Sequence, residues 1–157
     1  MLLQLCYASC RVELEQNLVQ DLSDILEKSC SFNHLHDIYG VLYYAEGIYF
    51  QCLEGEQSAV EALFQTIAQD RRHHQIHRFP DRMIENIHFK KWSMKYVQQH
   101  SRISKFFNEL GFKQFSPQQL NPQQLADLLA LLLILQKTQH KARTKISLKD
   151  QDEQNFF

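Results

Sequence analysis

Glycine is scarce in this sequence, with four residues in 157. The Gly-x-Gly-x-x-Gly fingerprint of dinucleotide-binding βαβ folds is absent, and so is the Gly-x-Ser-x-Gly turn that presents a nucleophilic serine in many hydrolases. The carboxylates of Glu54 and Glu56 have no recognisable acid or base partner. The sequence therefore does not indicate hydrolase or kinase chemistry, and we expect a protein that is not an enzyme.

The sequence also lacks a strong excess of positive or negative charge, long apolar runs and metal-ligand spacings. The net charge is −1 with histidine neutral, so we expect no direct nucleic-acid binding, which depends largely on Lys and Arg neutralising phosphates. The longest apolar run, residues 128–135, is too short for a bilayer, which needs roughly 20 residues, so no membrane association is expected. Eight histidines and four cysteines lack convincing metal-ligand spacing. We therefore expect no metal, and reduced thiols in a cytoplasmic protein.

The sequence does contain an alternation of strand-like and helix-like segments. Short runs rich in Val, Ile, Tyr and Phe predict five strands, over residues 2–7, 38–45, 48–53, 76–79 and 91–97. Apolar residues at helical spacing predict helices over 15–29 and 57–70, and the polar segment 31–37 is predicted to be a loop. Glu46-Gly47 predicts a tight hairpin turn. This order indicates an α+β, ferredoxin-like sandwich: a five-stranded mixed sheet with two helices on one face.

The composition changes after residue 97, where two C-terminal helices are predicted over residues 101–110 and 123–139. The second is apolar almost all round from Leu128 to Leu135, so it should be buried on several sides, and a partner or second subunit could supply that cover. We divide the chain into a sheet domain (1–97), a helical extension (98–140) and a charged, flexible tail (141–157).

Gln51 is the polar residue that stands out inside a strand. Alternation places it on one face with Tyr49 and Leu53. A buried amide without partners costs about 1–3 kcal/mol, so Gln51 must find hydrogen bonds. It is either a satisfied structural residue at a sheet edge or part of a site, and from this residue alone the structural interpretation is the simpler one. Tyr7 ends the first predicted strand.

Other polar and aromatic candidates also have a structural interpretation beside a functional one. Asn33 follows the first predicted helix, where such a residue often ends a helix or makes a turn. Arg72 and His73 follow the second, where basic groups favour the helix dipole but could also meet a phosphate. Trp92 and Met94 share one face of the last predicted strand, where core packing is the commoner role.

Together, seven short stretches resemble the BLUF family, the blue-light sensors that use FAD. They occur in the family's order and spacing from about residue 2 to 97: Leu5-Cys6-Tyr7-Ala8-Ser9, Asp21-Leu22-Ser23-Asp24-Ile25-Leu26, Asn33, Gly40-Val41-Leu42-Tyr43-Tyr44, Phe50-Gln51-Cys52-Leu53-Glu54-Gly55, Asp70-Arg71-Arg72-His73 and Trp92-Ser93-Met94. One such stretch would be weak, but seven in register are specific. The trailing helices further resemble those of short BLUF proteins without an enzymatic domain.

The resemblance implies FAD bound non-covalently between the two helices, and it implies roles for individual residues. Tyr7 matches the family's photochemical tyrosine, the electron donor to the excited flavin. Gln51 matches the glutamine whose hydrogen bonds to the flavin are rearranged by light. The other implied roles are contacts with the flavin or its ribityl-phosphate side for Ile25, Asn33, Arg72 and His73, and outward signalling for Trp92 and Met94.

The resemblance also implies an output through binding, to a protein partner such as a transcriptional regulator, with the C-terminal helices as docking or homo-oligomer surfaces. The alternatives are a light-insensitive protein-interaction module on the same fold and a small enzyme on a ferredoxin-like scaffold. Three departures from the family pattern, at His34-Leu35, Tyr39 and Thr66, bear on the phosphate contacts and the flavin affinity.

Overall fold

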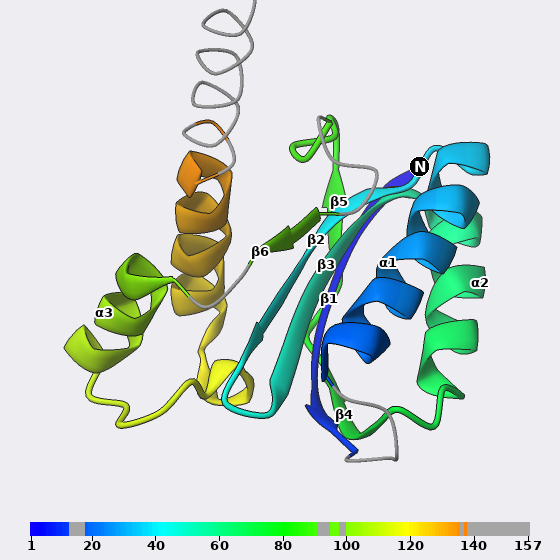
Figure 1. Ribbon diagram of the computed structural model, residues 1–157. Coiled ribbons are helices and arrows are strands. Elements are labelled where there is room, and N and C mark those ends of the chain that lie inside the picture. Colours follow the sequence, from blue (N-terminus) through cyan, green and yellow to red (C-terminus); the bar gives the residue numbers. More distant parts are fainter. Residues whose placement is uncertain (13–17, 91–94, 98–99, 136, 138–157) are drawn as a thin grey trace, which may run out of the picture.

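A twisted sheet forms the middle layer of the computed structural model, which describes residues 1–12, 18–90, 95–97, 100–135 and 137 (Figure 1). Its strands follow the order β4-β1-β3-β2-β6, and β5 pairs with β1 beside that path. The β2–β6 pair is parallel and the others are antiparallel, so the sheet is mixed, as predicted. The strand bounds are β1 Leu2–Arg11, β2 Tyr39–Ala45, β3 Ile48–Glu56, β4 His73–Arg78, β5 Arg82–Ile84 and β6 Lys95–Val97.

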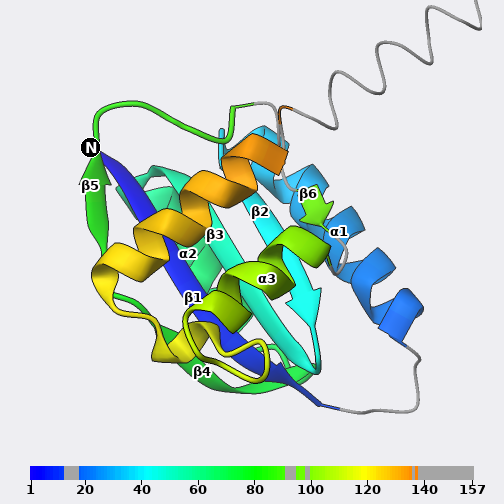
Figure 2. The ribbon, with the colours of Figure 1, turned by 90° about the vertical axis from the view of Figure 1, so that its left-hand side faces the viewer.

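Helices cover both faces of this sheet (Figures 1 and 2). On one face lie α1 (Leu18–Leu35) and α2 (Gln57–Ala68), which run beside each other. The other face is covered by α3 (Ser101–Glu109), the short 3₁₀ turn η1 (Pro117–Gln119) and a helix of residues 122–135. The ferredoxin-like sandwich with two helices on one face and two C-terminal helices is therefore confirmed.

Strand alternation sorts the apolar residues into two cores. Leu3, Leu5 and Tyr7 of β1 belong to the core under α1 and α2, whereas Cys6 and Ala8 belong to the core under the C-terminal helices. Because successive side chains of a strand point to opposite faces, one strand supplies both cores. The pocket described below lies on the first of these faces.

The β2–β3 hairpin closes at Glu46-Gly47, as predicted. Both residues have positive φ, 52° and 80° respectively, which suits the right-handed twist of the flanking strands and is tolerated without strain at Gly47. The resulting register pairs Leu42 of β2 with Gln51 of β3.

The sequence prediction was wrong about the end of the first helix. Residues 31–35 were predicted to be loop, but α1 continues to Leu35. The row of inward side chains runs from Leu22 through Ile25 and Ser29 to Asn33, which is fully buried. The last two inward positions, Ser29 and Asn33, are thus polar, and a periodicity based on apolar residues ended the predicted helix at residue 29. Asp37, with φ of 51°, follows the helix, and Ile38 N–H donates to the Asn33 carbonyl.

Two further differences concern the strands and the C-terminal helix. The three-residue strand β5 was not predicted, because a segment containing Arg82 and Met83, both exposed, carries little apolar pattern. The helix of residues 122–135 buries one side, through Leu125, Leu128 and Leu132, while Ile134 on another side is 48% exposed. Among the described residues, no helix is long and apolar enough to cross a membrane.

Candidate functional site

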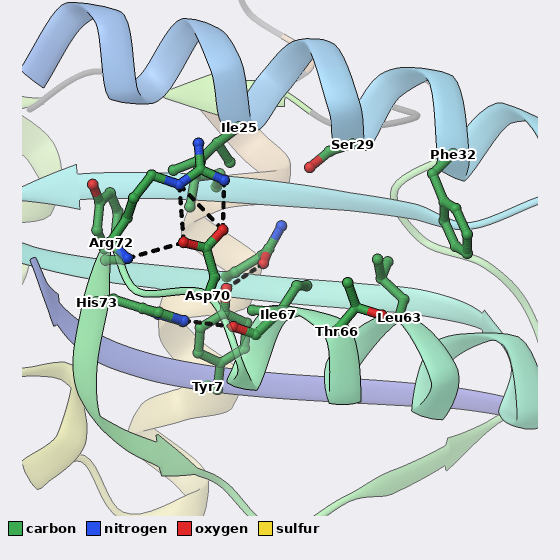
Figure 3. Close-up of a pocket in the computed structure, with 13 residues that line it drawn as sticks. Tyr7, Ile25, Ser29, Phe32, Leu63, Thr66, Ile67, Asp70, Arg72 and His73 are labelled. Carbon is green, nitrogen blue, oxygen red and sulfur yellow. Dashed lines mark hydrogen bonds and ion pairs between the residues drawn. The ribbon is translucent and has the colours of Figure 1, made fainter. Parts of the chain in front are cut away.

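A pocket of about 250 Å³ opens between α1 and α2, above the sheet (Figure 3). Ile25, Ser29 and Phe32 of α1 line one side, and Leu63 and Ile67 of α2 line the other. The floor comes from the sheet and the far end from the α2–β4 connection: Tyr7, Leu42, Tyr49, Gln51, Asp70, Arg72 and His73. The walls are therefore mostly apolar, and most of the polar groups gather at the floor and at one end.

Tyr7 and Gln51 form the polar centre of the floor. They are direct cross-strand partners on β1 and β3, and the Tyr7 hydroxyl donates a hydrogen bond to Gln51 Oε1 over 2.5 Å. The two residues are only 4% and 2% exposed. Since cross-strand neighbours on one face have Cβ atoms about 5 Å apart, the strand register alone brings this pair together.

The surroundings keep Tyr7 protonated. Burial raises the pKa of the Tyr7 phenol well above its usual range, and the nearby Asp70 carboxylate and Tyr49 raise this pKa further. The Tyr7 ring contacts Phe64, with centroids 5.5 Å apart, and meets the His73 ring edge-on at 6.1 Å. Tyr7 thus holds its proton on Oη and has one defined acceptor for it, Gln51 Oε1.

His73 ties the end of α2 to the sheet. Its Nε2 lies 2.6 Å from the Ile67 carbonyl, and its Nδ1 lies 2.7 Å from the Ser9 hydroxyl. A carbonyl only accepts, so Nε2 must carry a proton, and in the neutral ring Nδ1 accepts from Ser9. His73 is 8% exposed, so this arrangement fixes its tautomer and orientation at the pocket edge.

Asp70 and Arg72 form an ion pair at the end of the pocket (Figure 3). The guanidinium donates from Nε and Nη2 to both carboxylate oxygens, at 2.5 to 3.1 Å, and the Arg72 backbone N–H adds a bond of 2.9 Å. The hydrogen bonds from Arg72 lower the pKa of Asp70, and those to Asp70 raise the pKa of Arg72. Asp70 therefore carries a negative charge beside Tyr7.

The structure brings together most of the residues singled out in the sequence. Tyr7, Ile25, Gln51, Arg72 and His73 all line the one pocket. The fully buried Asn33 lies near the end of α1 and is not among the lining residues. Trp92 and Met94 lie outside the described residues. Within the described part of the chain, no group of three or more metal-ligating side chains occurs.

Sequence reasoning left several lining residues without a role: Ser29, Phe32, Tyr49, Leu63, Thr66 and Asp70. Thr66 stands where the family often has arginine, and its hydroxyl donates to the Ala62 carbonyl of its own helix. Asp70 lies in one of the seven stretches that resemble the family, but only the fold places it in the same pocket lining as Tyr7, whose pKa its charge raises. The signal that could have found Ser29 is its place on the inward row of α1.

The pocket suits a planar aromatic ring system. Its apolar walls lie on two helices, and its floor offers an amide, a phenol and an imidazole in one neighbourhood. The cavity volume of about 250 Å³ lies just below the range of about 300–1,000 Å³ that is common for ligand sites. It therefore suits the flavin ring alone, and the adenine part of FAD would lie outside. Gln51, Tyr7, Ile25 and Ile67 would surround that ring, and the amide of Gln51 can both donate to it and accept from it.

Comparisons with known proteins agree with this fit. A family model described as BLUF, sensors of blue-light using FAD, matches residues 2–95. No curated protein matches the chain. Among solved structures, BlsA in its photo-activated state is 48% identical with a TM-score of 0.82, and the match covers 85% of this chain and 96% of that one. BlsA in its ground state has the same identity and TM-score, with 85% and 89% covered.

More distant structures share the same domain. The dark state of BlrB, a BLUF protein, is 29% identical with a TM-score of 0.71, and the match covers 85% of this chain and 96% of that one. A bacterial light-regulated adenylyl cyclase is also 29% identical, with a TM-score of 0.63, but the match covers 71% of this chain and only 33% of the cyclase. The chain belongs to the BLUF family of blue-light sensors, whose cofactor is FAD.

Proposed function

We propose that in this blue-light sensor Tyr7 and Gln51 carry the photochemistry and that the output is a change in binding to a protein partner. The observation that carries the first part is the buried 2.5 Å hydrogen bond from the Tyr7 hydroxyl to Gln51 Oε1 on the pocket floor. The phenol and the amide are in direct contact at the base of the pocket, and the amide can exchange donor for acceptor when it rearranges.

Tyr7 is the proposed electron donor. When bound, FAD supplies the absorption of blue light and the electron acceptor. A phenol that gives up an electron becomes a strong acid, so its proton leaves most readily where an acceptor already waits. Gln51 Oε1 is that acceptor, and the raised pKa of Tyr7 ensures that the proton is present before illumination.

Gln51 is the proposed switch. Its side-chain amide presents an acceptor at one position and two donors at the other. With Oε1 toward Tyr7, as here, the NH₂ group is turned elsewhere. Rotation or tautomerisation of the amide would exchange donor for acceptor at both positions, which reverses the hydrogen bonds without moving the backbone far.

Ile25, Arg72 and His73 are the proposed supporting residues. Ile25 would pack against the ring from α1. His73 orients the end of α2 through Ile67 and Ser9, and Arg72 would interact with the ribityl-phosphate side. Asn33, placed by the resemblance at the flavin carbonyl edge, belongs to this proposal as a residue of the last turn of α1.

For the output we propose binding to a protein partner, a transcriptional regulator by analogy, with homo-oligomerisation through the C-terminal helices as another form of it. The light-regulated adenylyl cyclase matches this chain over only a third of its own length, so its catalytic part has no counterpart in the match. In the described part of this chain after β6, we find α3, η1 and the helix of residues 122–135. These helices suit a binding output rather than catalysis.

The decisive experiment compares absorption spectra of the FAD-loaded protein in the dark and after blue light. We expect a small, reversible red shift of the flavin bands in the wild type. Tyr7→Phe should keep bound flavin but lose the shift, because the phenolic proton is gone. The matched control is Tyr44→Phe, which removes a hydroxyl from β2 outside the pocket lining and should leave the shift intact. A Tyr7→Phe variant that still switches would remove Tyr7 from the mechanism, and a wild type that binds flavin without responding to light would favour the light-insensitive interaction module.

A further inference from the structure

A carboxylate on β3 has no exposure to solvent and no part in the pocket. The Glu54 side chain is 0% exposed. It lies three residues after Gln51 on the same strand, so alternation turns it toward the opposite face of the sheet. Buried carboxylates need compensating partners. The partners of Glu54 show which segments of the chain this carboxylate holds together.

Four donors surround the Glu54 carboxylate. Gln4 Nε2 donates to Oε1 over 2.7 Å, and His88 Nδ1 lies 2.9 Å from the same oxygen. The consecutive backbone N–H groups of His88 and Phe89 both donate to Oε2, over 2.7 and 3.1 Å. An ionised carboxylate only accepts, so His88 Nδ1 carries a proton here. Two successive N–H groups aimed at one oxygen resemble the backbone concavities that bind anions.

The segment that contains His88 and Phe89 reaches the core under the C-terminal helices, called the far core below. Residues 85–90 follow β5, which pairs with β1, and the chain then leads to β6, which pairs with β2. Residues 85–90 thus follow a strand that lies on one side of β3 in the strand order and precede a strand that lies on the other. Phe89 within it is 0% exposed and belongs to the same core as Phe107 of α3 and Leu132 of the C-terminal helix. Glu54 thus connects the strand of Gln51 to a side chain packed with the C-terminal helices.

We propose that Glu54 is a positioning residue that transmits the light-dependent change from β3, through His88 and Phe89, to the C-terminal helical layer. This inference rests on the proposed function, because it assumes that light alters Gln51. A change in the Gln51 hydrogen bonds shifts β3 slightly. The four directional bonds to Glu54 pass such a shift to the backbone of residues 88 and 89, and Phe89 passes it to the core beneath the helices.

A second hydrogen bond between the sheet and the C-terminal helices serves as the control. The Tyr43 hydroxyl accepts from the His100 backbone N–H over 3.2 Å and so also ties the sheet to the start of α3. Tyr43 is 1% exposed and lies on the far-core face, but it belongs to β2, which does not carry Gln51. If any sheet-to-helix contact could transmit the signal, Tyr43→Phe would disrupt it as well as a change at Glu54.

The test is hydrogen exchange of the FAD-loaded full chain in the dark and under blue light, with absorption recorded on the same samples. Glu54→Gln places an NH₂ group against existing donors in either orientation of its amide. We expect it to keep dark FAD affinity and the spectral shift. The light-minus-dark difference in exchange over 85–90, α3 and 122–135 should fall at least roughly threefold, because the hydrogen bonds that pass the shift of β3 to residues 88 and 89 are weakened. Tyr43→Phe should retain the wild-type difference.

A purely structural role for Glu54 would raise exchange equally in dark and light, leaving their difference unchanged. Wild-type-sized differences in Glu54→Gln would therefore overturn the inference while leaving the proposed function intact. A wild type without a light-induced shift would overturn both. If Glu54→Gln does not fold, His88→Ala, which removes only the side-chain bond, takes its place. It should reduce the light-dark difference in the same direction, and no reduction would again contradict the inference.

Discussion

The two faces of the central strands are built from alternate residues of the same segments, but they are filled differently. On the pocket face, Tyr7 and Gln51 lie under a gap between two helices. On the far face, Cys6 and Cys52, which are also direct cross-strand partners, are buried beneath the C-terminal helices. One face leaves room for a ligand and places polar groups on the floor of that pocket. The other is packed with apolar side chains and also buries the Glu54 carboxylate.

This contrast separates binding from stability along one strand pair. Residues on the pocket face should affect FAD binding more than folding, because they line space that the protein itself does not fill. Residues on the far face should affect folding more than FAD binding, because native cores are close-packed and large-to-small changes leave cavities. The predictions below test this separation, beginning with the largest expected effect.

Phe107→Ala should give the largest loss of stability. Phe107 is 2% exposed, and its ring meets those of Phe106, Phe112 and Phe115 at centroid distances of 5.3, 6.1 and 5.0 Å. Truncating a buried Phe typically costs about 3–5 kcal/mol. Urea unfolding of the apo-protein measures this change, while a titration of folded protein should show FAD affinity within about twofold of wild type, because no pocket residue is touched. A large loss of affinity in folded protein would show that the faces are not independent.

How much of this two-faced arrangement could be predicted from the sequence depends on the range of the interactions. Alternation in β3 placed Gln51 with Tyr49 and Leu53, and all three lie on the pocket side of the sheet. The family resemblance named five residues that do line the pocket. Local patterns were sufficient where one side of an element is apolar and the repeat is regular.

Long-range polar contacts could not be found in this way. Glu54 had no recognisable partner in the sequence, because its donors come from Gln4, 50 residues before it, and from His88, 34 residues after it. Asn33 was assigned to a loop because its neighbours are polar, although it is fully buried at the end of α1. Burial of a polar side chain depends on tertiary partners, which hydrophobic periodicity does not encode.

Filling the pocket should abolish FAD binding at little cost in stability. Ile25→Trp places a large side chain from α1 into a space of about 250 Å³. We expect FAD affinity to fall by a factor of roughly 100 or more, because the new side chain occupies the space that the flavin ring would take. The free energy of unfolding measured in urea should change by less than about 1.5 kcal/mol. Val19→Trp is the matched control, since Val19 lies on the same helix but is 76% exposed and should leave affinity unchanged. Wild-type affinity in Ile25→Trp would place the flavin elsewhere.

The effect that is smallest at neutral pH concerns protons buried on the two faces. Burial raises the pKa of the Tyr7 phenol on the pocket face and of the Cys52 thiol on the far face. Each group keeps its proton in the folded state at pH values where the unfolded chain loses it. The native state then binds more protons than the unfolded state, so stability falls as pH rises. Each such proton contributes a slope of up to about 1.4 kcal/mol per pH unit.

The two slopes should begin at different pH values, because the unfolded thiol titrates near 8.5 and the unfolded phenol near 10. In the apo-protein, Cys52→Ala should flatten the fall in stability from about pH 8.5 upward, and Tyr7→Phe should flatten it only above about pH 10. Urea unfolding midpoints measured at half-unit pH steps from 7.5 to 11 would resolve both effects. A loss of stability that a substitution causes equally at every pH lowers the whole curve without changing its slope. Bound FAD should not alter the Cys52-dependent slope, since that thiol faces the other core. A Tyr7→Phe curve parallel to wild type above pH 10 would mean that the fold does not raise the pKa of the Tyr7 phenol above its unfolded value, and this would contradict the burial of the phenol on the pocket floor.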